Sequence, residues 1–183
     1  AAHTPSYGRT VAHAVAATMR RWRGAWQREY TIACEATRVR GDQSEAVMDR
    51  RIGCLQHQRR HVAAVLASFA KPDAQTLAHA VESVAALPAA SQCSDLAAFA
   101  RVAPPNAAQS AQLGDFEVAI ARAKTALISE RLSSARERAA AVAKVAAAMG
   151  YGPAISRAER IRAETLWRSG QLNAATDAGL RSL

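Results

Sequence analysis

Aromatic residues are scarce in this sequence. They make up 5% of its 183 residues, whereas apolar residues as a whole make up 50%. Alanine is the commonest apolar residue, and it favours helices while adding little volume to a core. A chain of this length can still bury a sizeable core on its own. The composition therefore disfavours a sheet and predicts an all-α fold of closely packed helices.

Long hydrophobic runs are also missing. The longest candidates, such as VAAVLASFA at residues 62–70, have about half of the roughly 18 uncharged apolar residues that a membrane-spanning helix needs. We therefore expect no membrane span in this chain.

Motifs that would carry catalysis or cofactor binding are absent. The three cysteines form no C-x-x-C pair, which argues against a zinc or redox centre. Gly150 and Gly152 follow a predicted helix rather than the strand that precedes a phosphate-binding loop. His57 and His61 are four residues apart on a predicted helix, but no third ligand lies at a compatible offset. We expect both histidines to face solvent, and we expect no metal, no cofactor and no enzymatic activity.

Lysine is rare, so the positive charge comes from arginine. The formal net charge of +9 arises from 21 Arg and 3 Lys against 15 acidic residues, a balance typical of proteins that bind nucleic acid or anionic membranes. Here the arginines are scattered at helical spacing, which favours solvated helix faces. In RRWRGAWQREY at residues 20–30, Trp22 and Trp26 share a stripe with Val15 and Met19. Packing within the protein is therefore favoured over stacking on nucleic-acid bases.

Helix-breaking residues are few, and they divide the chain into helices. No Pro interrupts residues 9–40, where apolar residues recur mostly three and four apart, which predicts one long amphipathic helix. Gly41 predicts its end, and a second helix should run back to about Phe69, so that the two form a hairpin. A third helix is expected next, and its buried stripe contains Leu77, Val81 and Val84.

The sequence APPN at residues 103–106 is the clearest break further along the chain. Its Asn106 is expected to cap the helix that follows. We therefore expect two domains: an N-terminal helical bundle over residues 1–103, and tetratricopeptide-like helical hairpins over residues 104–183.

A repeat is visible near the C-terminus. With Ser156 as first position, four signature sites of the tetratricopeptide repeat, a helix pair of about 34 residues, are filled by Ala163, Leu166, Gly170 and Ala175. One such repeat earlier the pattern degenerates, since Arg136 stands where Gly is usual. The first helix of such a pair lines a groove, and in this register its groove residues are Arg157, Arg160, Glu164 and Trp167. We expect these four residues to bind an acidic or carboxylate-bearing partner.

Helix lengths also suggest how the cysteines pair. A helix rises 1.5 Å per residue, so from the corner at Gly41, Cys34 stands about 10 Å down the first helix and Cys54 about 16 Å down the second. The returning third helix brings the chain before Cys93 back beside Cys54. Because a disulfide needs Cα atoms within about 7 Å, Cys54–Cys93 is the favoured pair and Cys34–Cys54 the next. The third cysteine should then be a buried, small apolar residue.

Three segments together resemble a known arrangement: CEATRVRGDQSEAVMDRRIGCLQHQ at 34–58, LPAASQCSDL at 87–96, and the helical repeats after them. They resemble the region C-terminal to the kinase domain in large bacterial serine/threonine kinases of the Hanks type. The likeness covers about residues 20–183, and the residues that carry it best are Cys34, Gln43, Ser44, Arg51, Cys54, Leu55 and Cys93. The kinase motifs themselves, the Gly-rich loop, HRD and DFG, do not occur.

The resemblance implies a non-catalytic sensor region that binds a protein or peptide and has a kinase domain in cis. In many such kinases a membrane span separates the two parts, which implies an extracytoplasmic location and an oxidised disulfide; in the cytoplasm all three thiols would be free. Two alternatives stay open. One is a tetratricopeptide adaptor of a transcriptional regulator, and the other is a basic helical module that binds nucleic acid.

Overall fold

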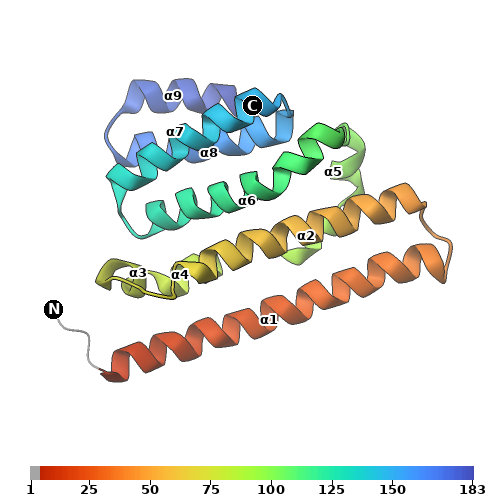
Figure 1. Ribbon diagram of the computed structural model, residues 1–183, viewed down its shortest axis with the longest axis horizontal. Helices are drawn as coiled ribbons and strands as arrows, with labels where there is room; N and C mark the ends of the chain where they lie inside the picture. The colour runs from red at the N-terminus through yellow and green to blue at the C-terminus, as the bar shows by residue number, and fades with distance from the viewer. Residues whose placement is uncertain (1–4) are drawn as a thin grey trace. The chain divides into compact units, whose positions relative to one another are not determined.

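The computed structural model describes residues 5–183, and these residues form helices and connecting turns with no strand among them (Figure 1). This confirms the predicted all-α fold. None of the described helices combines the length and the hydropathy that crossing a bilayer requires. The elements in chain order are α1 (Pro5–Arg38), α2 (Glu45–Ala67), α3 (Ala74–Ala78), α4 (Ala80–Ala85), the 3₁₀ helix η1 (Ala90–Ser94), α5 (Leu96–Arg101), α6 (Ala107–Ile128), α7 (Leu132–Met149), α8 (Gly152–Arg168) and α9 (Leu172–Arg181).

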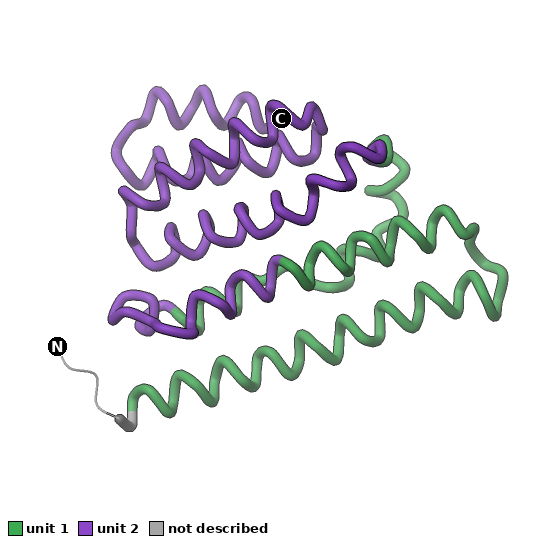
Figure 2. The backbone as a smooth tube through the Cα atoms, viewed as in Figure 1, with its two compact units in different colours: residues 1–60, 80–104 green, residues 61–79, 105–183 purple. Residues whose placement is uncertain are grey.

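The chain divides into two compact units (Figure 2). Unit 1 contains the residues up to Arg60 together with Ala80–Pro104, and unit 2 contains His61–His79 together with Pro105–Leu183. The division at Pro104 lies one residue from the expected boundary. The segment His61–His79, which we expected in the N-terminal bundle, belongs instead to the C-terminal unit.

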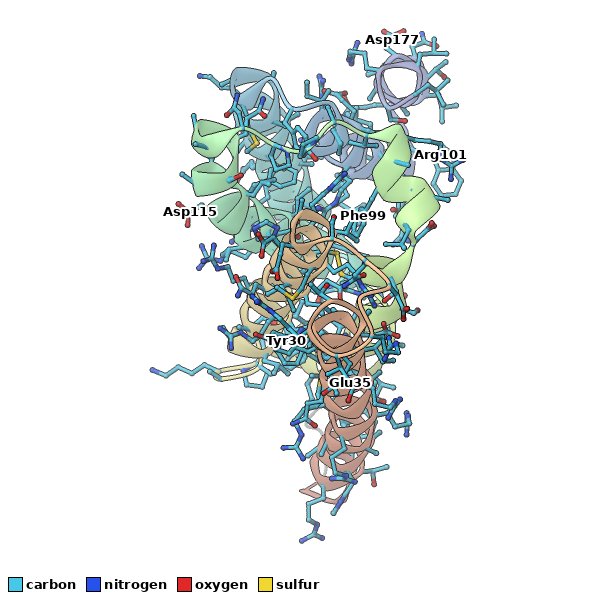
Figure 3. All side chains as sticks on the ribbon, turned by 90° about the vertical axis from the view of Figure 1, so that its right-hand side faces the viewer. Tyr30, Glu35, Phe99, Arg101, Asp115 and Asp177 are labelled. Carbon is cyan, nitrogen blue, oxygen red and sulfur yellow. A yellow bond between two sulfur atoms is a disulfide. The ribbon has the colours of Figure 1, made fainter. Side chains whose placement is uncertain are left out.

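Unit 1 is built on the hairpin of α1 and α2. Gly41 lies between them with a φ of 71°, the left-handed conformation that glycine adopts without strain. The Asp42 N–H donates to the Ala36 carbonyl at 2.7 Å and so closes the end of α1. Beyond this corner, α5 is held to α2 by Arg50, whose guanidinium lies 5.1 Å from the centre of the Phe99 ring. Phe99 is labelled in Figure 3.

The tryptophans of α1 are partly buried and packed within unit 1. The Trp22 indole N–H donates to the Pro88 carbonyl at 2.9 Å, and that of Trp26 donates to the Leu55 carbonyl at 2.8 Å. Trp26 also packs on the small core formed by Leu55, Ala90 and Cys93. Both rings are therefore fixed by the fold, which confirms the predicted packing role.

The expected third helix is broken in two. The α3 helix ends with His79 as its C-cap, and α4 starts at Ala80, so the break coincides with the division between the units. The predicted buried stripe was wrong: Val81 is exposed and Leu77 is only partly buried, whereas Val84 is buried as expected. The side chains that are buried here are Thr76, Ala80, Ser83 and Val84.

Unit 2 packs α6 against α7, α7 against α8, and α8 against α9, and α6 also contacts α8. Asn106 caps α6 as predicted: its Oδ1 accepts the Gln109 N–H at 2.9 Å, and the Gln109 side chain accepts the Asn106 N–H at 3.0 Å. Small side chains allow helices to approach closely. The core is accordingly rich in alanine and contains Leu113, Phe116, Ile120, Ala123, Ala139, Val142, Ala146, Met149, Ala154, Ala158 and Ile161.

Two hairpin turns of unit 2 share one geometry. The Arg131 N–H donates to the Ala126 carbonyl at 3.0 Å, and the Gln171 N–H donates to the Leu166 carbonyl at 2.9 Å. Glu130 and Gly170 occupy the same place in the two turns, and both are left-handed, with φ of 55° and 75°. The interval from Glu130 to Gly170 is longer than a standard tetratricopeptide repeat. The predicted repeat spacing, which placed Arg136 opposite Gly170, was therefore wrong, because Glu130 holds that position.

Candidate partner-binding surface

The α8 helix carries all four predicted partner-binding residues. Arg160, Glu164 and Trp167 are exposed, and Trp167 is 64% exposed. Their spacing of four and three residues places them on one face of the helix. We call these three residues the α8 surface. Arg157 lies one turn earlier and is partly buried.

Arg157 is engaged within unit 2. Its Nη2 donates to Glu117 Oε2 at 2.8 Å and its Nη1 donates to Glu117 Oε1, which makes a bidentate ion pair between α8 and α6. Its guanidinium also lies 5.5 Å from the centre of the Phe116 ring. A guanidinium held in this way is not free to hold a partner. The structure thus places the predicted binding residue Arg157 in a positioning role behind the α8 surface.

Glu117 is buried and lies beside a second basic side chain. His61 Nδ1 lies 3.5 Å from Glu117 Oε2, and the two side chains are each only 6% exposed. Burial by itself raises the pKa of Glu117, but the bidentate Arg157 guanidinium and the neighbouring His61 outweigh burial and lower this pKa to about 2. The expectation that His61 faces solvent was wrong, because the end of α2 packs within unit 2. Sequence reasoning also missed Glu117, which no motif marks.

The ion pair joins equivalent positions of the structural repeat. Glu117 and Arg157 are 40 residues apart, which is also the interval from Glu130 to Gly170. Lys124 and Glu164 are equivalent in the same way: burial lowers the pKa of Lys124, and the Glu164 carboxylate opposes this effect. Glu164 also accepts from Arg168 Nη2 at 2.8 Å. Glu164 is therefore balanced by cations of its own unit.

Arg160 is the cation of the α8 surface that remains available. It forms no ion pair with any residue from 5 to 183. With Trp167 it offers a guanidinium and an indole two turns apart on the same helix. A hollow of about 270 Å³ lies on another side of α8, lined by Arg136, Arg162, Thr165, Leu166 and Gln171, and does not include the α8 surface.

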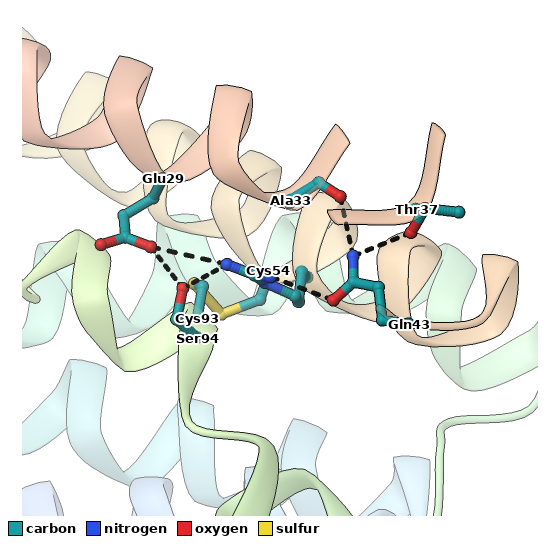
Figure 4. A network of polar contacts seen from close by, with 8 residues as sticks. Glu29, Ala33, Thr37, Gln43, Cys54, Cys93 and Ser94 are labelled. Carbon is teal, nitrogen blue, oxygen red and sulfur yellow. Dashed lines mark hydrogen bonds and ion pairs between the residues drawn. A yellow bond between two sulfur atoms is a disulfide. The ribbon is translucent and has the colours of Figure 1, made fainter. Parts of the chain in front are cut away.

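A polar network in unit 1 surrounds the disulfide (Figure 4). Cys54 and Cys93 are bonded with their Cα atoms 5.6 Å apart, which confirms the predicted pair. Beside them Arg51 is buried; it donates to Gln43 Oε1 at 3.0 Å and Ser94 Oγ at 2.7 Å, and lies 3.7 Å from Glu29 Oε2. This network ties the α1–α2 corner to η1.

The residues that carry the family resemblance are largely the ones that hold this corner. Gln43 donates to the Ala33 carbonyl at 2.7 Å and to Thr37 Oγ1 at 2.9 Å, while Leu55 is buried in the core. Cys34 has a free thiol and is partly buried rather than fully buried as expected. These contacts hold the corner together.

The described residues contain no group of three His, Cys, Asp or Glu side chains that could hold a metal ion. Comparison with protein-family models, curated proteins and solved structures gives no match for this chain. Its own residues therefore carry the functional evidence, and the α8 surface is the candidate site.

Proposed function

We propose that this chain is a non-catalytic protein- or peptide-binding region of a bacterial serine/threonine kinase, and that it binds its partner through the α8 surface. The exposure of Arg160, Glu164 and Trp167 on one face of α8 supports the proposed surface. The family resemblance supports the attachment to a kinase. The helices of unit 2 would then act as a tetratricopeptide-like scaffold that presents α8.

One observation carries the binding proposal, and it comes from the repeat. Trp167 on α8 is the equivalent of Leu127 on α6, and these two residues differ in exposure: Leu127 is 1% exposed, whereas Trp167 is 64% exposed. When a partner covers a large aromatic side chain that was exposed to water, the free energy of the system falls. Trp is also enriched among the residues that dominate binding energies.

The chemistry of the α8 surface indicates the kind of partner. Arg160 is unpaired within the described chain, and a guanidinium pairs best with carboxylate or phosphate. Trp167 would pack against an apolar side chain of the partner, about two turns of α8 from the group that pairs with Arg160. The expected partner is therefore an acidic peptide segment, or a C-terminal carboxylate, with an apolar residue nearby.

Location follows from the same proposal. The disulfide between Cys54 and Cys93 is of the kind that persists in oxidising compartments, which supports an extracytoplasmic position beyond a membrane span of the parent kinase. Reading the gene upstream of the codon for Ala1 tests this directly. A kinase domain followed by a membrane span is the expected result, and a DNA-binding domain would favour the regulator adaptor instead.

Selection from a phage-displayed peptide library tests binding. We expect enriched peptides to be acidic, and Trp167→Ala to weaken their affinity at least about tenfold. Arg160→Gln should weaken it as well. The matched control is Arg138→Gln, an exposed arginine of α7 whose side chain donates to Ser134 on its own helix. Peptides that bind the Trp167 variant as tightly as the wild type would refute the proposed surface.

A further inference from the structure

Unit 1 contains a hollow that has no role in the proposal above. It lies between α1, α4 and η1 and has a volume of about 400 Å³, within the range of about 300–1,000 Å³ that is common for small-molecule sites. Trp22, Ala25, Val84 and Leu87 supply apolar lining, and Arg21 and Arg28 supply cations. We call it the Trp22 hollow.

The two arginines of the Trp22 hollow have no acidic partner. Neither Arg21 nor Arg28 forms an ion pair with any residue that the structure describes. Arg21 Nη2 donates to Thr18 Oγ1 at 3.0 Å. Arg28 Nη1 lies 3.5 Å from the place where a Cβ on Gly24 would stand. Both side chains therefore run back along α1 toward its N-terminus.

The carboxylate that lines the hollow does not neutralise these cations. Glu29 accepts from Ser94 Oγ and lies 3.7 Å from buried Arg51. Its charge is therefore balanced within the network beside the disulfide. From Pro5 to Arg28 the α1 helix has five arginines and no acidic residue. The field in the Trp22 hollow is consequently positive, and it favours an anion.

The apolar part of the hollow is already in place without a ligand. Hydrogen bonding to the Pro88 carbonyl fixes the Trp22 indole, and Val84 is only 2% exposed. A preformed apolar wall needs little ordering when a ligand binds, which reduces the entropic cost of binding. A purely inorganic anion would leave this wall unused.

We propose that the Trp22 hollow binds a small organic anion with an apolar body, whose carboxylate is held by Arg21 and Arg28. The ligand's apolar body would cover Trp22, Ala25 and Leu87, and its charge would lie toward the two guanidinium groups. A long polyanion such as nucleic acid would use exposed arginines of α1 outside the hollow, such as Arg20 and Arg23, equally well. These arginines do not line the hollow, and they therefore separate the two possibilities.

Fluorine NMR of the full chain labelled with fluorotryptophan tests this proposal. The chain has three tryptophans, so the Trp22 signal can be assigned with single Trp→Phe variants. The probes are hydrocinnamate and hexanoate, and the matched probes are their uncharged primary amides. We expect both acids to shift the Trp22 signal saturably at millimolar concentration, and the amides to bind at least about tenfold more weakly.

The variants decide whether Arg21 and Arg28 form the site. Arg21→Gln and Arg28→Gln should each weaken hydrocinnamate binding about tenfold, since a charge-assisted hydrogen bond is lost. Arg23→Gln removes the same charge from the same helix outside the hollow, and it should leave the affinity within about twofold. Any one of three results would overturn the proposal. They are the absence of a saturable shift with both acids, an amide that binds as tightly as its acid, and a loss of affinity in the Arg23 variant equal to that in the Arg21 and Arg28 variants. The Trp22 hollow lies in unit 1 and the α8 surface lies in unit 2. The outcome of this experiment therefore does not depend on whether the α8 surface binds a peptide.

Discussion

Replacing Glu117 with Gln removes the carboxylate that Arg157 and His61 share, and its effect on stability should depend on pH. The pKa of Glu117 falls from an ordinary 4.5 to about 2 in the folded protein. One pKa unit corresponds to about 1.4 kcal/mol, so the ionised carboxylate contributes about 3 kcal/mol to the free energy of unfolding at neutral pH.

The sign of the pH dependence follows from the direction of that shift. Because the folded protein holds the pKa below its unfolded value, the contribution is fully present above about pH 5 and is lost as the pH falls toward 2. The difference in unfolding free energy between wild type and Glu117→Gln should therefore shrink by about 2 kcal/mol between about pH 5 and about pH 2.5.

Urea unfolding followed by circular dichroism at several pH values measures this difference. The matched control is Glu164→Gln, which removes an exposed carboxylate paired with Arg168 on the same helix. It should change the unfolding free energy by less than about 0.5 kcal/mol, because solvent screens that pair. A difference between wild type and Glu117→Gln that does not vary with pH would show that the ion pair is not buried as described.

Further predictions concern the disulfide and the glycines. Cys54 and Cys93 are 39 residues apart, and reduction of their disulfide should lower the unfolding free energy measured in urea titrations by about 4 kcal/mol. The Cys34→Ser variant should lose the same amount when the reductant is added. An unfolding free energy that does not change on reduction would refute the bridge. Gly170→Ala should cost about 1 kcal/mol, because φ is 75° there and a Cβ is disfavoured in that conformation. Gly53→Ala, inside α2 with open space around it, should instead stabilise the protein by up to about 1 kcal/mol, and thermal unfolding of both variants separates the two effects.

The fold class and the cysteine pairing could be predicted from the sequence because they depend on local rules and lengths. Helical spacing predicted where the two long helices of the hairpin run, and the rise per residue placed Cys54 and Cys93 at one height. The stripe of the third helix was missed because its break at His79 depends on which unit each half joins. Helical periodicity alone contains no information about such a division.

The buried charges could not be predicted because they depend on tertiary packing. His61 was expected to face solvent on account of its polar neighbours, but it pairs with Glu117 on α6, a helix far along the chain from α2. Such a pair becomes visible only when the helices are packed. The repeat spacing shows a related limit: signature positions identified the hairpin at Gly170, whereas the equivalent turn at Glu130 has no glycine and was found by its φ of 55°.

Amide NMR mapping of a selected peptide tests the central claim most directly, namely that α8 presents the partner-binding surface. Titration of the labelled chain with an enriched acidic peptide should shift the amide signals of Arg160, Glu164 and Trp167 first. The Trp167 indole signal should move with them, because Trp167 is 64% exposed. Shifts confined to unit 1 or to α9, with the α8 signals unchanged at saturation, would contradict the proposed binding surface.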